Sequence, residues 1–306
     1  HWAAPGRVME RDGRGLWFGV AAYGLWGIGP AFWKLLDGVP ALQQTAHRVV
    51  WSVPILVAAV MLLGRRARLR AAVADRRTVA LTVVAGALLT TNWAVFVWAI
   101  SADRIVEASL GYFINPLVSV ALGVMVLGER LRPARAAAVA LAAIGVAYMT
   151  VRLGSVPWVS LVLAGSFGLY GLMKKRPHSA PPLEGLLGET AVAALPALAF
   201  LAVLAARGEG SFGDGAGVTL LLVATGAVTA APLLLFGAAA QRIPLSTVGL
   251  LQYLAPTLQF VLGVVVYGEA VSGDQVIGFA FVWMALAVFT VDNLRAARPA
   301  PAGPAG

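Results

Sequence analysis

The segment SLGYFINPLVSVALGVMVLGERL, residues 109–131, recurs in altered form as GLLQYLAPTLQFVLGVVVYGEAV, residues 249–271. Eight of the 23 aligned positions are identical, among them Pro116 with Pro256 and the Gly-Glu pairs at 128–129 and 268–269. Apolar segments match by chance easily, so the shared prolines and the shared Gly-Glu pairs are the informative part of the match. We interpret the two segments as copies of an internal duplication.

The composition is that of a membrane protein. Of the 306 residues, 59% are hydrophobic and 12% are charged, and the mean hydropathy is +0.82. This leaves too little polar surface for a soluble domain of the same size. A span of a bilayer needs about 20 predominantly apolar residues. We therefore predict an all-α integral membrane protein with ten transmembrane helices, near residues 15–36, 42–64, 78–101, 107–128, 134–152, 157–174, 183–206, 217–240, 245–268 and 273–294.

The positive charges divide unequally between the two sides of the predicted bundle. Eighteen of the 23 Lys and Arg residues fall in the N-terminal tail, the C-terminal tail and alternate links. Cytoplasmic segments carry such an excess, so both termini are expected in the cytoplasm of a multi-pass protein of the cell inner membrane. The net charge of +9 therefore reports topology, and no nucleic-acid partner is expected. The basic link at residues 65–77 is expected to be a solvated loop near anionic membrane lipid.

The duplication has a geometric consequence, because an offset of 140 residues holds five spans. A repeat of an odd number of spans is inverted in the membrane. The predicted organisation is a cytoplasmic tail at 1–14, a first five-helix repeat at 15–152, an inverted second repeat at 153–294 and a disordered cytoplasmic tail at 295–306. Inverted repeats are typical of secondary transporters that work by alternating access. A channel-like or facilitative pore without coupling is the alternative.

Several motifs together resemble one known family. They are AYGLWGIGPAFWK from residue 22, HRVVWS from 47, NW at 92, EASLGYFINPLVS from 107, GER at 128 and LQYLAPT from 251. In these motifs the chain resembles the RarD branch of the EamA transporters, in the drug/metabolite transporter superfamily. The resemblance covers nearly the whole chain. It implies ten helices in two inverted repeats and efflux of a small organic metabolite or drug, with no cofactor.

The resemblance also implies a substrate site. The central cavity of that superfamily is lined mainly by the first, third, fourth, sixth, eighth and ninth helices. On this chain those helices supply Tyr23, Trp26, Asn92, Trp93, Tyr112, Asn115, Tyr170, Gln252 and Tyr253. Their rings and amides suit a small amphipathic or aromatic ligand. For the asparagines an interhelical hydrogen bond is an equal alternative, and for tryptophans an interfacial belt, which we expect for Trp2, Trp17 and Trp158.

Charged residues inside the membrane are costly and therefore functional candidates. Topology predicts an outer group of Lys34, Gln43, Gln44, His47, Arg48 and Glu107, and an inner group of Lys174, Lys175, Glu184 and Glu189. We assign gating or coupling to His47, Arg48, Glu107 and Glu189, with the proton as candidate coupling ion and Glu107 or Glu189 as its carrier. For the three lysines we favour the simpler interpretation that they reach the lipid headgroups.

Other classes of protein lack support in the sequence. The chain has only His1, His47 and His178 and no cysteine, so it offers no catalytic or metal-binding set, and we predict that it is not an enzyme. Glu129 and Glu269 are expected to be structural, capping links or pairing with Arg130 and its neighbours. Small residues such as Gly111, Gly123, Gly249 and Gly263 are expected to permit close helix packing.

Overall fold

A computed structural model of the chain describes residues 13–153, 157–269 and 272–297. The described residues form helices and connecting links, without a β-strand. The helices are α1 (Gly13–Trp33), η2 (Lys34–Leu36), α2 (Ala41–Leu62), α3 (Arg66–Ala74), α4 (Arg76–Ser101), α5 (Ile105–Leu127), α6 (Pro133–Leu153), α7 (Trp158–Lys174), α8 (Pro182–Arg207), α9 (Ala216–Ala240), α10 (Leu245–Gln252), α11 (Leu254–Val261), η3 (Leu262–Val266) and α12 (Gly273–Ala297). The predicted all-α class is confirmed.

Eight helical segments of the described chain are long and apolar enough to cross a membrane. The segment Leu245–Val266, which contains α10, α11 and η3, counts as one of them. The helix α7 is apolar but has only 17 residues, and α1 is not among the eight because glycine and aromatic residues lower its hydropathy. The spans expected at 15–36 and 157–174 therefore stay predictions. Trp2 and most of the two predicted tails lie outside the described residues.

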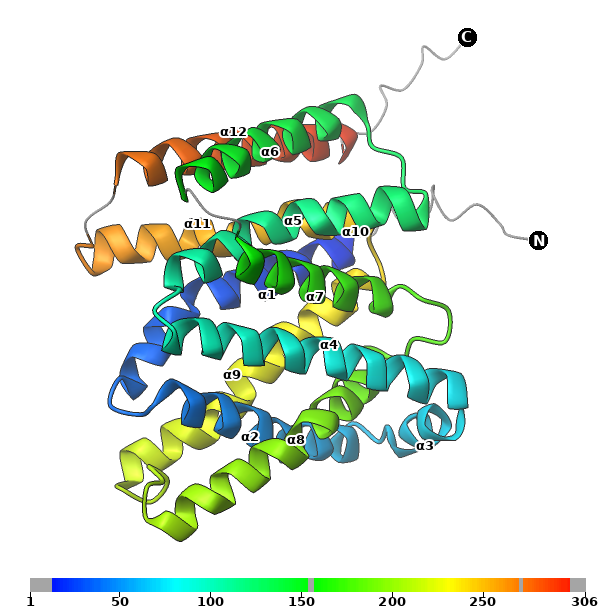
Figure 1. The fold of residues 1–306 in the computed structure, drawn as a ribbon. Helices are drawn as coiled ribbons and strands as arrows, with labels where there is room; N and C mark the ends of the chain where they lie inside the picture. Colours follow the sequence, from blue (N-terminus) through cyan, green and yellow to red (C-terminus); the bar gives the residue numbers. More distant parts are fainter. Residues whose placement is uncertain (1–12, 154–156, 270–271, 298–306) are drawn as a thin grey trace.

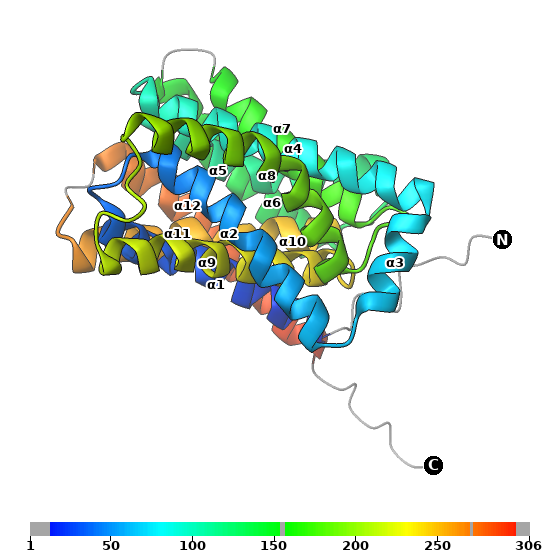
Figure 2. The ribbon, with the colours of Figure 1, turned by 90° about the horizontal axis from the view of Figure 1, so that it is seen from below.

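The long helices run back and forth between two ends of an elongated bundle (Figures 1 and 2). One end holds α3, the α5–α6 link, the α7–α8 link and the α9–α10 link, and we call it the basic end. The other holds the α1–α2, α4–α5 and α8–α9 links, and we call it the opposite end. The start of α1 and the end of α12 both lie at the basic end (Figures 1 and 2).

The helix α3 was not expected, because the sequence predicted a solvated loop over residues 65–77. Its sequence, RARLRAAVA, consists largely of residues with high helix propensity, and none of its residues is buried. Asp75 separates it from α4 and caps that helix, accepting hydrogen bonds from the backbone N–H groups of Arg77 and Thr78. The basic link is therefore a short surface helix joined by a tight corner to a span.

The ninth expected span is interrupted, although its repeat partner α5 is continuous. The break falls at Tyr253, between α10 and α11, and five residues of π-helix follow at Leu262–Val266. Pro256 lacks a backbone N–H, so the carbonyl of Gln252, four residues earlier, has no helical donor. Both Pro116 and Pro256 are buried. The same residue type at the same repeat position is thus accommodated differently in the two segments.

Close helix contacts hold the bundle together. The helix α5 packs against α7 and α10, α2 packs against α8 and α9, and α6 and α12 form a pair along one side (Figure 1). At Gly226 on α9, an added Cβ would lie only 2.4 Å from the backbone carbon of Trp51 on α2. Ser52 on α2 also donates a hydrogen bond to the Gly226 carbonyl at 3.1 Å. Such an approach of two backbones requires glycine.

The small residues predicted to permit packing divide into two kinds. Gly111 faces Ser160 and Leu163 on α7, and Gly249 faces the Pro116 carbonyl on α5, where an added Cβ would be 2.8 Å away, as expected. Gly123 and Gly263 lie beneath carboxylates of their own segments, and Gly123 also faces α10, where an added Cβ would be 3.1 Å from the backbone nitrogen of Ser246. An added Cβ would be 2.6 Å from Glu129 Oε2 at Gly123 and 2.9 Å from Glu269 Oε2 at Gly263.

Candidate functional site

A buried ion pair lies at the basic end, between the last turn of α7 and the second turn of α8. Lys174 and Glu189 form it, and each side chain is only 3% exposed. The hydroxyl of Tyr170, one turn before Lys174, donates a hydrogen bond of 2.9 Å to the other Glu189 oxygen. The expectation that Lys174 reaches lipid headgroups is wrong, because a buried carboxylate is within its reach and stabilises the ammonium group.

Three further contacts close the basic end around this pair. Glu184, fully buried on the first turn of α8, pairs with Arg65 at 3.0 Å. The Thr78 hydroxyl oxygen lies 2.9 Å from the carbonyl oxygen of His178, and the His178 ring lies 3.6 Å from the Asp75 carboxylate. The α7–α8 link is thereby joined to the corner between α3 and α4, and α8 is joined to the residue that precedes α3. The inner group predicted from sequence is thus assembled in part, with Arg65 as a member that the sequence did not indicate.

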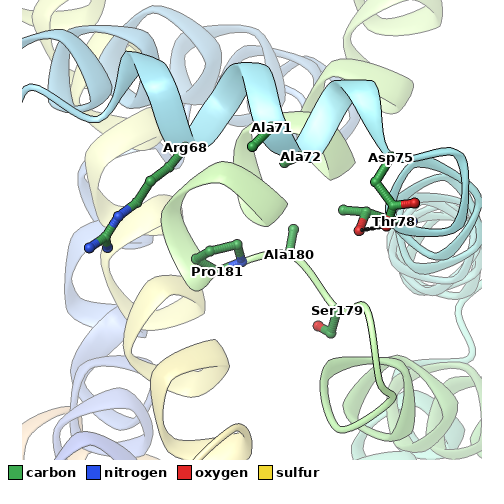
Figure 3. A pocket seen from close by; sticks show the side chains of 8 residues that line it. All are labelled: Arg68, Ala71, Ala72, Asp75, Thr78, Ser179, Ala180 and Pro181. Atoms are coloured by element: carbon green, nitrogen blue, oxygen red, sulfur yellow. Dashed lines mark hydrogen bonds between the residues drawn. The ribbon is translucent and has the colours of Figure 1, made fainter.

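A groove opens at this end beneath α3 (Figure 3). It has a volume of about 430 Å³ and is lined by Arg68, Ala71, Ala72, Asp75, Thr78, Ser179, Ala180 and Pro181. A second hollow shares Ser179 and Ala180 with it and reaches Lys174 and Glu189, but its volume is only about 10 Å³. That is about the minimum for a single water molecule. The groove therefore ends at a constriction beside the ion pair.

Two groups at the basic end have shifted pKa values. Burial lowers the pKa of Lys175 to about 8, and the carboxylate of Glu129 opposes the shift. The pKa of Asp75 is lowered, chiefly by the hydrogen bond from the Thr78 hydroxyl and further by the backbone N–H groups that it caps. Lys175 is half-buried, and the expectation that it reaches the headgroups stays a prediction.

Five aromatic rings lie between the two ends of the bundle. Tyr23 and Trp26 come from α1, Phe167 and Tyr170 from α7, and Phe236 from α9. The rings of Tyr170 and Phe236 are stacked with centroids 5.6 Å apart, and Trp26 contacts Phe167 at 5.9 Å and Phe236 at 6.1 Å. Three of these residues were predicted as substrate-binding and the structure brings them together. Because Tyr170 also contacts Glu189, the rings adjoin the ion pair.

Sequence reasoning missed Phe167 and Phe236. Phenylalanine in an apolar span carries no polar atom, and its usual place is the core or the lipid-facing surface. The available signal was spacing, since Phe167 lies three residues before Tyr170 and therefore on the same face of α7. Phe236 had no comparable signal.

Gln252, Tyr253 and Asn115 lie where α10 meets α5. Gln252 donates to the Ser119 hydroxyl at 3.0 Å, and the Tyr253 hydroxyl donates to the Phe113 carbonyl at 3.2 Å. The side-chain oxygens of Asn115 and Gln252 are buried without a hydrogen-bond partner. These two oxygens are acceptors available to a ligand N–H or O–H group.

Asn92 joins two helices. Its amide nitrogen donates to the Leu163 carbonyl at 2.9 Å and to the Ser166 hydroxyl at 3.0 Å, both on α7. This is the interhelical hydrogen bond that the sequence offered as an alternative to ligand binding. The amide nitrogen of Asn92 is therefore engaged by α7, and the side-chain oxygen is the atom left to accept a hydrogen bond from a ligand.

The outer group predicted from sequence is not assembled as one cluster. Glu107 pairs at 3.1 Å with Arg104, one turn earlier, rather than with Arg48. Lys34 lies 3.3 Å above the ring of Tyr267. Residues three apart on a helix face each other, so the Arg104 pairing was available from the sequence and competes with any pairing across helices.

The other polar residues of the outer group form hydrogen bonds to links between helices or contact an aromatic ring. Gln43 donates to the Glu209 carbonyl at 2.8 Å, and Gln44 donates to the Val39 carbonyl at 2.8 Å, so the two amides secure the α8–α9 and α1–α2 links. His47 stacks on Phe212 of the α8–α9 link at 5.5 Å. These contacts make the outer glutamines structural, and they give His47 a ring contact at the opposite end.

Arg48 lies apart, surrounded by aromatic rings. Its guanidinium carbon is 4.6 Å from the Trp93 ring centroid and 6.0 Å from that of Trp33. Tyr112 on α5 lies near enough to interact with it electrostatically and is 46% exposed. The Arg48 Nε atom is buried without a hydrogen-bond partner, and no described carboxylate forms an ion pair with this residue. Trp93 and Tyr112 therefore belong with Arg48 and not with the central rings.

Two further expectations from the sequence concern the glutamates near the ends of the matched segments and the tryptophans of the interfacial belt. Glu129 accepts hydrogen bonds from the backbone N–H groups of Leu245 and Ser246, which confirms its structural role as a cap of α10. Its repeat partner Glu269 makes no side-chain hydrogen bond to a described residue. Trp17 is 71% exposed and Trp158 is 41% exposed, which fits the interfacial belt expected for them.

Eight long apolar helices, with charged residues paired or enclosed by rings between them, define a multi-pass helical membrane protein. The model of the EamA-like transporter family matches the chain twice, at residues 13–151 and 156–291. The chain therefore belongs to the EamA-like transporter family. It is a membrane transporter and not an enzyme.

Similar proteins define the branch of this family. Protein RarD of Streptomyces exfoliatus is 48% identical over 285 residues, which cover 93% of this chain and 90% of that protein. Protein RarD of Escherichia coli strain K12 is 40% identical over 286 residues, covering 93% and 96%. A solved crystal structure of a protein shares the fold, with a TM-score of 0.72 and 23% identity over 92% of this chain and 99% of the other. The chain is thus a RarD-type member of the family.

Proposed function

We propose that this protein is a secondary active transporter that moves a small organic metabolite or drug out of the cell by alternating access. The observation that supports this most directly is the unequal pairing of charged residues at the two ends. At the basic end, the Lys174–Glu189 pair is buried beside a hollow of about 10 Å³. At the opposite end, Arg48 lacks a carboxylate partner and Tyr112 is 46% exposed. A carrier is closed at one end by such contacts in each of its two states, and the loss of these contacts opens that end.

The proposed architecture is ten spans in two inverted five-helix repeats, at 15–152 and 153–294, with both termini in the cytoplasm of the inner membrane. Matched geometry supports the duplication. Gly128 and Gly268 have φ angles of 67° and 66°, and each following glutamate donates its backbone N–H at 3.0 Å to the glycine six residues earlier. Two separate segments adopt the same terminal turn because they share one ancestral sequence.

The contact between Tyr253 and Phe113 supports the inversion. These residues are 140 positions apart and therefore equivalent in the two repeats, and the Tyr253 hydroxyl donates to the Phe113 carbonyl. Near a twofold axis a residue contacts its own symmetry mate. This contact therefore lies near the axis about which the two halves would exchange their conformations.

The proton is the proposed coupling ion, and Glu189 is its better carrier. Protonation of Glu189 would remove one charge of the buried pair, leaving Lys174 without a counter-ion and favouring an opening of the basic end. Glu107 pairs with the more exposed Arg104, so protonation there would disturb the closure of the basic end less. In transport assays, Glu189→Gln is expected to abolish the pH dependence of transport, whereas Glu107→Gln is expected to retain it.

Export of an aromatic or amphipathic compound is the proposed activity. A relative in Pseudomonas aeruginosa, 32% identical over 294 residues, is named chloramphenicol-sensitive protein RarD. The central rings and the free oxygens of Asn115 and Gln252 suit a ligand with a flat apolar body and a hydrogen-bond donor.

The test begins with thermal stabilisation of the purified protein by amino acids, aromatic metabolites, nucleosides and amphenicols, since a ligand of the folded state raises its stability. A stabilising compound is then used in proteoliposomes, where saturable counterflow is expected. Flux that does not saturate and shows no counterflow would instead indicate an uncoupled pore and would contradict the proposal.

A further inference from the structure

Two buried donors on one face of α2 have no acceptor among the residues that the structure describes. They are the Nε atom of Arg48 and the indole Nε1 atom of Trp51, one helical turn further on. Both groups can only donate hydrogen bonds. A buried donor without an acceptor costs about 1–3 kcal/mol, and more when it is charged. An acceptor from outside the chain would relieve this cost.

Arg48 differs from three other cations of the described chain. Lys174 pairs with Glu189, Arg104 with Glu107 at 3.1 Å, and Arg152 with Asp274 at 2.9 Å. A cation near the centre of a span costs about 2.5–3.5 kcal/mol on insertion scales, so a counter-ion is strongly favoured. Each of these three cations has a carboxylate of the chain beside it, whereas Arg48 over Trp93, like Lys34 over Tyr267, has none among the described residues.

The surroundings of Arg48 determine which counter-ion fits. Its guanidinium lies over the ring of Trp93, and Trp33 is further away on the same side of the bundle. A guanidinium that lies on an aromatic face keeps its N–H groups directed outward in its own plane. That fork matches the two oxygens of a carboxylate. The adjoining surface is aromatic as well, since Tyr112 contacts Phe96 at 5.9 Å.

We propose that Arg48 is the anion-binding group of a substrate subsite at the opposite end of the bundle, separate from the central rings, and that the substrate is a monocarboxylate with an aromatic or flat apolar body. The carboxylate binds the guanidinium fork, and the body lies against Trp33, Trp93 and Tyr112. This inference rests on the proposed transport function and names its substrate class. Arg48 is half-buried on the second turn of α2, and Tyr112 is 46% exposed.

Equilibrium binding to the full-length protein in detergent tests the proposal without any transport step. The probes are 3-phenylpropionate, its neutral amide 3-phenylpropionamide and the cation 3-phenylpropylamine, which share one ring and differ in the charged group. The acid is expected to raise the melting temperature with dose, and to bind at least about tenfold more tightly than the amide or the amine, a difference of about 1.4 kcal/mol.

Variants assign the effect to Arg48. Arg48→Gln is expected to weaken binding of the acid at least tenfold while leaving the weak binding of the amide unchanged, and Arg48→Lys is expected to be intermediate because it keeps the charge but loses the fork. Arg104→Gln is the matched control, since it removes an arginine from the same end that already has a carboxylate partner. Both Arg48 variants are first shown to be folded by a cooperative melting transition.

Several outcomes would overturn the proposal. They are equal binding of acid and amide, unchanged binding of the acid to folded Arg48→Gln, or no binding of 3-phenylpropionate at about 10 mM. Inorganic phosphate and chloride are tested separately as simple anions. If either stabilises the protein as strongly as the acid and loses this effect in Arg48→Gln, the site binds simple anions and the substrate class is wrong. Alternating access is tested separately by a measurement that uses no ligand, so the two proposals fail independently.

Discussion

The carboxylate of Glu129, just after α5, accepts a hydrogen bond of 2.8 Å from the backbone N–H of Ser246, at the start of α10. It also accepts the Ser246 hydroxyl at 2.6 Å and the Leu245 N–H at 2.6 Å. The start of a helix has N–H groups without helical partners, and a negative charge there is favourable. A residue just after α5 thus holds the start of α10, whose sequence resembles that of α5.

Glu129→Gln should therefore destabilise the protein by about 1–2 kcal/mol, since it removes the charge and one of the two accepting oxygens. The measurement is the midpoint of unfolding in detergent. Glu269→Gln is the matched control, because the Glu269 side chain makes no hydrogen bond to a described residue. An equal loss in the two variants would contradict the capping role.

The buried pair of Lys174 and Glu189 predicts strong non-additivity. Lys174→Met alone leaves a buried carboxylate without its counter-ion and should cost about 3–5 kcal/mol. Lys174→Met combined with Glu189→Leu should cost much less than the sum of the single changes. Unfolding of the wild type, the two single variants and the double variant gives the coupling free energy. Additive losses would show that the two side chains do not depend on each other.

Lys175 predicts a pH dependence of stability. Burial lowers its pKa from 10.5 to about 8 in the folded protein, so between pH 8 and 10.5 the unfolded chain holds more protons. Stability contributed by this group should then rise with pH, by up to about 1.4 kcal/mol per pH unit. Lys175→Met should remove this rise and stabilise the protein at pH 7. The exposed neighbour Arg176 supplies the control Arg176→Gln, which should leave the pH profile unchanged.

The contact of α9 with α2 predicts that Gly226 tolerates no side chain. An added Cβ would meet the backbone of Trp51 and Ser52 at 2.4 and 2.7 Å, and backbone atoms cannot rotate away. Gly226→Ala should lower stability by about 1–3 kcal/mol, the usual cost of overpacking. Gly217→Ala on the same helix has no atom within 4 Å of the added Cβ and should have little effect. Similar melting temperatures for both variants would contradict the close packing.

Much of the fold follows from the sequence because apolar length and proline positions are local signals. The expected segments at 42–64 and 78–101 match α2 and α4 within two residues at each end. The helix α3 escaped prediction because its arginines indicated solvent exposure, which does not distinguish a loop from a surface helix. The break at Tyr253 escaped because the same proline position in α5 leaves that helix intact, so tertiary packing decides between the two outcomes.

The site was less predictable because it depends on distances between helices. Glu189 and Lys174 could be placed at the same membrane depth, and they do pair. The same reasoning placed Glu107 with Arg48, yet Glu107 pairs with the nearer Arg104. Depth is set by position along a span, whereas the partner is set by the rotation of each helix. Sequence reasoning had no signal for the rotation.

The most direct test of alternating access is cysteine labelling from each side, which is clean because the chain has no native cysteine. Thr82→Cys places a thiol in the small hollow at the basic end, and Tyr112→Cys places one at the opposite end. With the ion pair intact, Tyr112→Cys should react and Thr82→Cys should be protected. Adding Lys174→Gln should make the cysteine at position 82, at the basic end, reactive and should protect the cysteine at position 112. The charge exchange Lys174→Glu with Glu189→Lys should restore the original labelling pattern. Reciprocal changes at the two ends are the predicted result, and an increase at both positions would contradict alternating access.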